Sequence, residues 1–599
     1  MSDPNNTSIP AHPVGPTPGV KPVYPQRPPR PEKCETILHI GVFFDGTGNN
    51  MYEHEPRPAQ GKKPEQLPKQ SNVARLFRAY PDEPDQGYFR MYVPGAGTAF
   101  PEIGEVQELP SGSGFGAGGD GRINYGLLHV LNSINRAVSP NGRRYVEADT
   151  IRALCRNGRR AQSRSQGRNA DRVPLADPAD EAALRAVGMD SIGGLLLDAS
   201  ASAPQRTAFF KRAAAKVKQN ISEIEKPKPI EIFIDVFGFS RGAAEARVFC
   251  NWLLEVFEGE TLCGVPASIR FMGLFDTVAS VGLPTSAGYG FNGHQSWGDA
   301  PFLRVSAAVK NCVHYVAMHE NRGSFPSEQV HVEGVLPANC HEFMFPGMHS
   351  DVGGGYSPTD QGRGPGGKDG EKLSLLALEA MYGAAKVAMV PLDSALARKV
   401  SYNPFQIDKN VREAFGAFMG ARQRSQPVRE WLFEYLAWRY QVRTTYNSLP
   451  WHGRANAQDR EDLHGANQRL LDDVAALAGL EQPEPDRFHS DAKTQKQRDA
   501  WRRRVAGLKK EAKTVYERVK SAQGTDPAAA TLFADYVHDS YAGFRPFDQL
   551  KVWGWDPIPG SWEGEGYLRW RRRYEGNDEQ LTRVEPTNTP VEQSRSEIA

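Results

Sequence analysis

Residues 231–247, EIFIDVFGFSRGAAEAR, set the expectation for the whole architecture. The run from Ile232 to Phe237 is short, apolar and rich in strand-forming residues, and an apolar helical stretch begins at Ala243. The turn between them, Gly238-Phe239-Ser240-Arg241-Gly242, fits the pattern Gly-x-Ser-x-Gly. A serine at a sharp strand-to-helix turn adopts a strained backbone, and the flanking glycines leave room for it. The stretch therefore predicts a nucleophile elbow with Ser240 at its tip.

The alternative for this stretch is an ordinary tight turn in which Ser240 only caps the helix. A bare Gly-x-Ser-x-Gly pattern recurs by chance, but here a strand precedes it and a helix follows it. That context favours a nucleophile. The helix N-terminus would also offer the backbone amide of Arg241 and a partial positive charge to a developing oxyanion.

A second polar turn follows the first predicted strand, Thr36 to Phe44. Its sequence, Asp45-Gly46-Thr47-Gly48-Asn49-Asn50, lies where α/β proteins place ligand-binding groups, at the carboxyl end of a strand. It lacks the lysine of a phosphate-binding loop and the spacing of a dinucleotide fingerprint. We expect the amide of Gly46 or Thr47 to be the second oxyanion donor. The alternative is a simple strand-ending turn.

The segments between these turns alternate between the two kinds of element. Asn72 to Tyr80 and Ile123 to Val138 have helical patterns, and Phe89 to Val93 has a strand pattern. Alternating strands and helices predict a mostly parallel, doubly wound sheet with helices on both faces. The expected fold is therefore α/β and resembles the α/β-hydrolases, with a helical accessory domain after it.

Two later strands carry the remaining catalytic candidates. Asp276 lies near the carboxyl end of the predicted strand Ile269 to Val278, and His349 follows the predicted strand His341 to Gly347. A buried Asp is costly unless it is paired, so Asp276 is predicted to orient a histidine, and His349 to be the general base. The chain order nucleophile, acid, histidine matches that of α/β-hydrolases.

Alternatives remain open for both partners of the serine. Asp351 could replace Asp276 as the acid, shape its glycine-rich loop or bind a cation, and His538 with Asp539 is the rival catalytic pair. The stretch Asn311 to Glu320, NCVHYVAMHE, is predicted to be a helix, with His314 and His319 as ordinary helix residues.

The composition changes along the chain and predicts four parts. Residues 1–33 are rich in proline and are expected to be a disordered tail or a docking arm. Residues 34–365 form the predicted catalytic domain, with a solvated insertion around 140–225 whose arginines could alternatively meet anionic lipid. Residues 366–575 are expected to form the helical accessory region, and 576–599 a disordered tail. Within the helical region the aromatic patch around Trp431 and Trp438 is either core or a membrane contact.

Charge and cysteine content exclude several function classes. A net charge of +1 gives no bias toward nucleic acid. No apolar run reaches the roughly 18 residues of a spanning helix, and the start of the chain has no export-signal pattern. The six cysteines are scattered without metal-ligand spacing, which is typical of small core residues in a reducing compartment.

Several of these motifs together resemble one known family. The motifs GVFFDGTGN (41–49), VFGFSRGA (236–243), GLFDTV (273–278) and GMHSDVGGGY (347–356) are similar to those of the bacterial family of uncharacterised α/β-hydrolase domains. That family includes the first family of type VI secretion lipase effectors. The motif YVPGAGT (92–98) is a further match, and YVHDSYAGF (536–544) extends the likeness weakly toward the carboxyl end.

The resemblance implies a serine phospholipase that cuts glycerophospholipid esters with Ser240, Asp276 and His349. No motif distinguishes the sn-1 from the sn-2 ester, so A1 and A2 types both stay open. It implies no organic cofactor, and it does not specify calcium. It further implies synthesis in a bacterial cytoplasm and delivery by the type VI system to a target cell's membrane or periplasm. A spike protein and an immunity protein are the implied partners. The rival functions are a soluble esterase or thioesterase, and a non-enzymatic module on a hydrolase scaffold.

Overall fold

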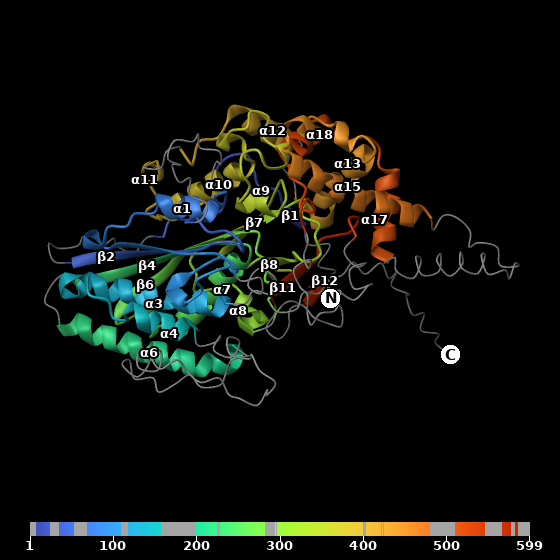
Figure 1. The fold of residues 1–599 in the computed structure, drawn as a ribbon. Helices are drawn as coiled ribbons and strands as arrows, with labels where there is room; N and C mark the ends of the chain where they lie inside the picture. The colour runs from blue at the N-terminus through green and yellow to red at the C-terminus, as the bar shows by residue number, and fades with distance from the viewer. Residues whose placement is uncertain are drawn as a thin grey trace, which may run out of the picture.

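The computed structural model describes residues 8–23, 35–52, 69–108, 118–156, 199–223, 228–281, 294, 296–398, 403–420, 422, 425–479, 510–544, 566–576 and 582–584. A mostly parallel sheet lies at the centre with helices on both faces, and a further group of helices extends beyond one end of it (Figure 1). This arrangement confirms the predicted α/β fold.

The central sheet has seven strands in the order β3-β2-β4-β6-β7-β9, with β5 attached to β6. All five pairings along that order are parallel, and only β5 runs antiparallel to its neighbour. The strands are β2 (Glu35–Phe44), β3 (Tyr88–Val93), β4 (Lys228–Phe239), β5 (Thr261–Leu262), β6 (Val265–Phe275), β7 (Cys312–Ala317) and β9 (Cys340–Phe345). Because the strands are parallel, their carboxyl ends share one edge of the sheet.

Neighbouring residues on each strand serve two different cores. On β2, Val42 packs into one core and Phe43 into the other, and on β4, Val236 and Phe237 divide in the same way. This is the period of two expected of a strand, and burial of both faces explains the nearly continuous apolar runs in the sequence. One face is covered by α3 (Gly119–Val138), α4 (Ala148–Arg156), α6 (Ala199–Glu223), α7 (Arg241–Leu254) and α8 (Ala300–Leu303).

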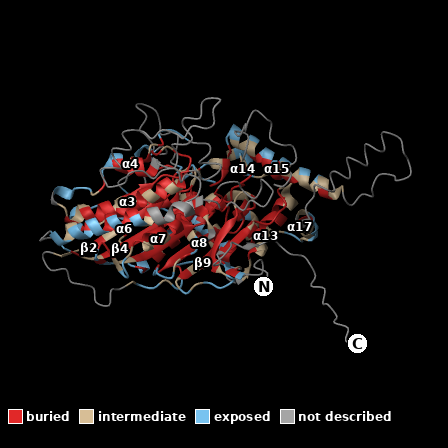
Figure 2. Ribbon diagram, turned by 90° about the horizontal axis from the view of Figure 1, so that it is seen from below, coloured by how far each residue is buried: buried red, intermediate tan, exposed pale blue. Residues whose placement is uncertain are grey.

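The opposite face is covered by α1 (Asn72–Ala79) and α10 (Ser374–Val387), and its core continues into the helical region. Trp431, Tyr435 and Trp438 of that region are buried, so the aromatic patch is core rather than a membrane contact. Figure 2 shows the burial running from the sheet into α13. The remaining helices are α9 (His349–Gly353), α11 (Ser394–Ala397), α12 (Lys409–Gly420), α13 (Val428–Val442), α14 (Trp451–Arg454), α15 (Ala457–Ala478), α17 (Lys510–Ser521) and α18 (Pro527–Asp535).

The predicted disordered tail is wrong for residues 8–23. Ile9 is fully buried on β1 (Ser8–Pro10), which pairs antiparallel with β10 (Ser425–Pro427). The N–H of His12 donates to the carbonyl of Met344 on β9, 2.8 Å away. An edge strand presents unpaired backbone groups, and this segment covers part of that edge. The rest of the predicted tail, residues 1–7 and 24–33, lies outside the described residues.

The predicted helix at Asn311 to Glu320 is also wrong. Residues Cys312–Ala317 form β7, and every one of them is buried between β6 and β9. Periodicity does not separate a fully buried strand from a buried helix, because both read as a continuous apolar run.

Two further boundaries differ from the predictions. The expected solvated insertion contains the helices α4 and α6. Phe209, Phe210 and Val217 of α6 are buried in the core beneath one face of the sheet. Residues 157–198 lie outside the described residues. Residues 582–584 of the expected carboxyl tail form β12 (Thr582–Val584), which pairs with β11 (Arg573–Gly576). β11 in turn runs parallel to β8 (Ser327–Val332).

No helix in the described part of the chain is both long enough and apolar enough to cross a bilayer. The five described cysteines are all buried and free, as predicted for core residues.

Candidate active site

Ser240 lies between the end of β4 and the start of α7, at the carboxyl edge of the sheet. Its backbone has φ 59° and ψ −127°, a strained conformation for a residue with a side chain. A Cβ added at Gly238 would lie 2.5 Å from the Cα of Ala243, and one added at Gly242 would lie 2.3 Å from the carbonyl oxygen of Asp45. Both glycines are therefore required by close backbone contacts, and the predicted elbow is present.

The structure brings Ser240, His349 and Asp276 into one hydrogen-bonded line. The Oγ of Ser240 is 2.7 Å from Nε2 of His349, and Nδ1 of the same ring is 2.6 Å from Oδ2 of Asp276. Each residue follows the carboxyl end of a strand, β4, β6 or β9. All three side chains are buried, with Ser240 only 4% exposed. This geometry lets the imidazole hold the carboxylate on one nitrogen and accept the serine proton on the other.

The carboxylate of Asp276 accepts three hydrogen bonds besides the one from the histidine ring. The N–H of Ala317 donates to Oδ1 at 2.9 Å, and Nη1 and Nη2 of Arg571 donate to Oδ1 and Oδ2, each at 2.7 Å. Burial alone would raise the pKa of Asp276, but the Arg571 charge and the His349 hydrogen bond outweigh it and hold that pKa well below the ordinary value. The carboxylate is therefore ionised and fixed in orientation.

His349 has a pKa below its ordinary value, chiefly because burial disfavours the charged ring. The hydrogen bond to Asp276 opposes this, and the nearby Arg322 reinforces it. The rings of Phe239 and Phe325 pack on the imidazole, with centroids 4.7 and 5.0 Å away. The imidazole is thus neutral near pH 7 and able to accept a proton.

A second carboxylate, that of Glu320, accepts a hydrogen bond from the backbone of His349. Its Oε2 accepts the N–H of His349 at 3.3 Å and the hydroxyl of Ser540 at 2.7 Å. Nε and Nη2 of Arg322 each donate to Glu320 at 3.0 Å. Burial raises the pKa of Glu320, but the Arg322 charge wins and lowers it to about 2.

The predicted oxyanion loop packs directly beside the elbow. The Nε of Arg241 donates to the Oγ1 of Thr47 at 2.7 Å, which ties the loop to the start of α7. The N–H of Gly46 donates to the Asp45 carboxylate at 2.7 Å, so it is already engaged. The N–H of Thr47 has no hydrogen-bond partner among the described residues. Of the two donors expected from the sequence, Thr47 is the one the geometry favours.

The rival pair lies elsewhere. Nδ1 of His538 is 2.6 Å from Oδ1 of Asp351, whose Oδ2 accepts the N–H groups of Met348 and His538 at 3.0 Å each. Among the described residues, no hydrogen bond joins His538 or Asp351 to Ser240 or to the ring of His349. Asp539 binds Tyr567 and Arg439 instead. His538 and Asp351 fix α9, which carries His349, in place.

Sequence reasoning missed two residues that contact this cluster. Glu320 follows β7 closely, and reading that stretch as a helix hid its place at a strand end. Arg571 lies 295 positions from Asp276 in an arginine-rich stretch with no motif, so no local signal pointed to it.

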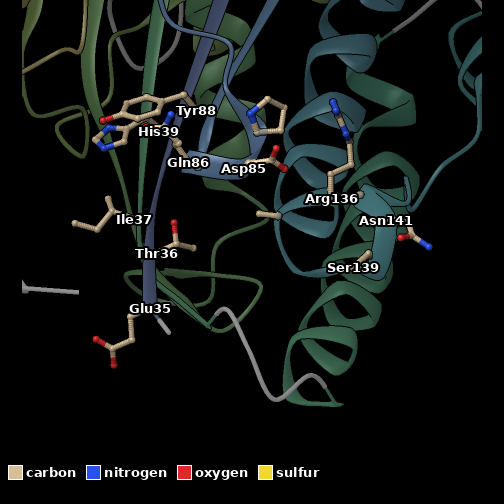
Figure 3. Close-up of a pocket in the computed structure, with 14 residues that line it drawn as sticks. Glu35, Thr36, Ile37, His39, Asp85, Gln86, Tyr88, Arg136, Ser139 and Asn141 are labelled. Atoms are coloured by element: carbon tan, nitrogen blue, oxygen red, sulfur yellow. The ribbon is translucent and has the colours of Figure 1, made fainter. Parts of the chain in front are cut away.

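Among the described residues, no group of three or more His, Cys, Asp and Glu side chains is arranged to hold a metal ion. A cavity of about 720 Å³, lined by Glu35, His39, Tyr88 and Arg136 among others, lies at the amino ends of β2 and β3 (Figure 3). It is at the opposite edge of the sheet from Ser240.

The sheet, the elbow and the hydrogen-bonded cluster define an α/β-hydrolase-like protein. More particularly, residues 253–384 match the family described as T6SS, phospholipase effector Tle1-like, catalytic domain. The matched segment contains Asp276 and His349 and begins after Ser240. Residues 253–384 are therefore similar to the catalytic domain of Tle1-like phospholipase effectors, in agreement with the resemblance seen in the motifs.

Solved structures that are similar to this chain include two whose likeness differs in extent. The crystal structure of an uncharacterized protein from Pseudomonas aeruginosa has 23% identity and a TM-score of 0.62, over 93% of this chain and 82% of that one. This likeness supports the fold alone. The structure of the Tle1 effector bound to the VgrG spike from the Type 6 secretion system has 22% identity over 55% of this chain and 53% of that one. Its TM-score of 0.25 is too low to carry an argument. No curated protein matches the chain.

Proposed function

We propose that this protein is a serine phospholipase that hydrolyses ester bonds of glycerophospholipids through Ser240, His349 and Asp276. The observation that carries the proposal is the 2.7 Å contact between Ser240 Oγ and His349 Nε2, in a ring whose other nitrogen is bound to Asp276. Support for a phospholipid substrate is the family description of residues 253–384.

Acylation begins when His349 Nε2 takes the proton of Ser240 and Oγ attacks the ester carbonyl carbon. The carbonyl oxygen becomes an oxyanion, which the amides of Arg241 and Thr47 stabilise. Loss of one such donor typically costs about 10²–10³ in rate. The tetrahedral intermediate then expels the alkoxide oxygen of the lysophospholipid, and the imidazolium gives it the proton.

Deacylation repeats these steps with water in place of the serine. His349 takes a proton from the water, the hydroxide attacks the acyl-serine, and the ester bond to Oγ breaks. The proton returns to Ser240 and the fatty acid leaves. Asp276 keeps the imidazole in the tautomer with a proton on Nδ1 and stabilises the imidazolium in both halves of the cycle. The chemistry needs side chains and water only.

We also propose delivery by the type VI system, with a spike protein as carrier and an immunity protein as inhibitor in the producing cell. The support is the family description, which names that system. The proposed site of action is the membrane or periplasm of a target bacterium.

The test compares the wild-type protein with Ser240→Ala on phospholipid vesicles and on a soluble short-chain ester. Ser222→Ala is the matched control, since Ser222 lies on α6 and its hydroxyl donates to the carbonyl of Gln219 on the same helix. We expect vesicle hydrolysis in the wild type and control, and none in Ser240→Ala. Lipids labelled at one acyl chain then assign the A1 or A2 type. Hydrolysis that survives Ser240→Ala would overturn the proposal, and activity on the short ester alone would replace the phospholipase with a soluble esterase.

A further inference from the structure

Arg571 reaches the active site from a part of the chain far from the catalytic motifs. It belongs to residues 566–576 and comes just before β11. β11 runs parallel to β8, with Arg573 opposite Ser327, and the N–H of Ser327 donates to the carbonyl of Arg572 at 2.9 Å. The backbone immediately after Arg571 is therefore fixed to the body of the protein.

The guanidinium of Arg571 binds Asp276 through two parallel hydrogen bonds, each 2.7 Å long. Its side chain is 3% exposed and that of Asp276 is fully buried. Its Nε donates to the carbonyl of Phe325 at 2.8 Å, and the Phe325 ring packs against His349. A bidentate pair of this kind fixes direction as well as distance, and a lysine does not reproduce it.

All the donors to Asp276 act on one small carboxylate. Oδ1 accepts from Ala317 and Arg571, and Oδ2 accepts from His349 and Arg571. Without Arg571, each oxygen would keep one donor and the carboxylate plane would no longer be set by a rigid partner. A small rotation there moves the imidazole, because the 2.6 Å contact to Nδ1 sets the direction of the ring.

We propose that Arg571 is a positioning residue, which acts through Asp276 to aim the His349 ring at Ser240 and to moderate the basicity of that ring. This inference rests on the proposed serine hydrolase. The carboxyl-terminal segment would then complete the active site, rather than serve only as an accessory to it.

The sign of the basicity effect follows from the charges around the ring. The charged and titratable groups that face this point are Asp276, Glu320, Arg322 and Arg571, with the buried His314 behind Asp276. Arg571 offsets the negative charge of Asp276. Its replacement by a neutral residue leaves that charge uncompensated, which stabilises the imidazolium and raises the pKa of His349.

The test is the pH profile of kcat/KM for Arg571→Met, Arg571→Lys and the wild type on the same vesicles. We expect Arg571→Met to lower kcat by about tenfold to a hundredfold, less than the roughly 10⁴ that follows loss of the acid's orienting role. Its KM should stay unchanged, and its acid limb should move to higher pH. Arg571→Lys keeps the charge and should leave the limb in place, with a smaller loss in kcat. Added guanidinium should restore part of the activity of Arg571→Ala.

Arg573→Met is the control for general damage to this segment. Arg573 is buried two positions further along, and the donors to Asp276 are Ala317, His349 and Arg571. We expect it to lower stability without moving the pH profile. The inference is overturned if folded Arg571→Met has the wild-type kcat and pH profile. It is also overturned if the activity of Arg571→Met falls equally at every pH and guanidinium does not restore Arg571→Ala. If Ser240→Ala remains active, the proposed function itself fails, which is a separate result.

Discussion

At the scale of single residues, His349 is the proposed general base, and His538 supports the helix that carries it. The Nε2 of His349 is 2.7 Å from Ser240, whereas the ring of His538 is bonded to Asp351. We therefore expect His349→Ala to lower kcat by roughly 10⁴–10⁶. His538→Ala should keep most of the activity per folded molecule. Steady-state hydrolysis of vesicles, normalised to the folded fraction, measures both, and the reverse ranking would refute the assignment.

The pH dependence of the wild type follows from the same ring. His349 has a pKa below the ordinary 6.5, mainly because it is buried. The base must be neutral to act, so kcat/KM should stay on its plateau as the pH falls past 6.5 and decline only below it. A pH series in buffers of constant ionic strength measures this. An acid limb centred at or above 6.5 would contradict the structure.

Some of these residues can be predicted from the sequence and others cannot, for physical reasons. Ser240 is predictable because its strained turn needs glycines, and these lie within two residues of it in the sequence. Asp276 and His349 are predictable because each follows a strand, and parallel strands bring their carboxyl ends together. Arg571 is joined to Asp276 only by folding across 295 positions, and no periodicity or spacing encodes such a contact.

At the scale of elements, the elbow depends on the close approach of α7 to the oxyanion loop. Gly242→Ala would place a methyl group 2.3 Å from the carbonyl oxygen of Asp45. We expect it to cost about 1–3 kcal/mol of folding free energy by overpacking, and to lower kcat more than stability explains, since the loop must move. Urea denaturation and vesicle assays measure the two effects.

The matched control for that substitution is Gly465→Ala on α15, where an added Cβ meets nothing within 4 Å. It should be neutral or stabilise the protein by up to about 1 kcal/mol, because alanine favours a helix more than glycine does. Equal effects of the two substitutions would show that the elbow is not closely packed.

The sequence predicts the type of an element well where polar and apolar residues form a clear pattern. It predicts the type badly where an element is buried on all sides, because the pattern is then lost. The strands β2, β3, β4, β6 and β9 and the helices α1 and α3 lie within a few residues of their predicted ranges. The sequence predicts a helix at β7, because a strand buried on both faces has no alternation of polar and apolar residues. That error also concealed Glu320.

At the scale of the whole molecule, the amino-terminal segment is part of the folded body. Ile9 is fully buried against the helical region, and Trp431 Nε1 donates to its carbonyl at 3.3 Å. We expect Ile9→Ala to lower the free energy of unfolding by about 2–5 kcal/mol. Val14→Ala is the control, since Val14 is 53% exposed, and should change it little. Urea denaturation distinguishes the two variants. A negligible effect of Ile9→Ala would show that this segment does not pack on the folded body.

The whole-molecule organisation was the least predictable level. Proline-rich composition suggested a tail, yet Ile9 and His12 find partners on β10, α13 and β9, hundreds of positions away. The carboxyl-terminal segment likewise joins β8 rather than trailing from the helical region. Composition reports how a segment behaves alone, while these placements depend on edges and faces that exist only once the sheet has formed.

Covalent labelling tests whether His349 makes the hydroxyl of Ser240 nucleophilic. Folded protein treated with a fluorophosphonate should gain one adduct, which peptide mass spectrometry should place on Ser240. Labelling should be lost in Ser240→Ala and slowed by orders of magnitude in His349→Ala. An adduct on another residue, or equal labelling rates in the wild type and His349→Ala, would contradict the account.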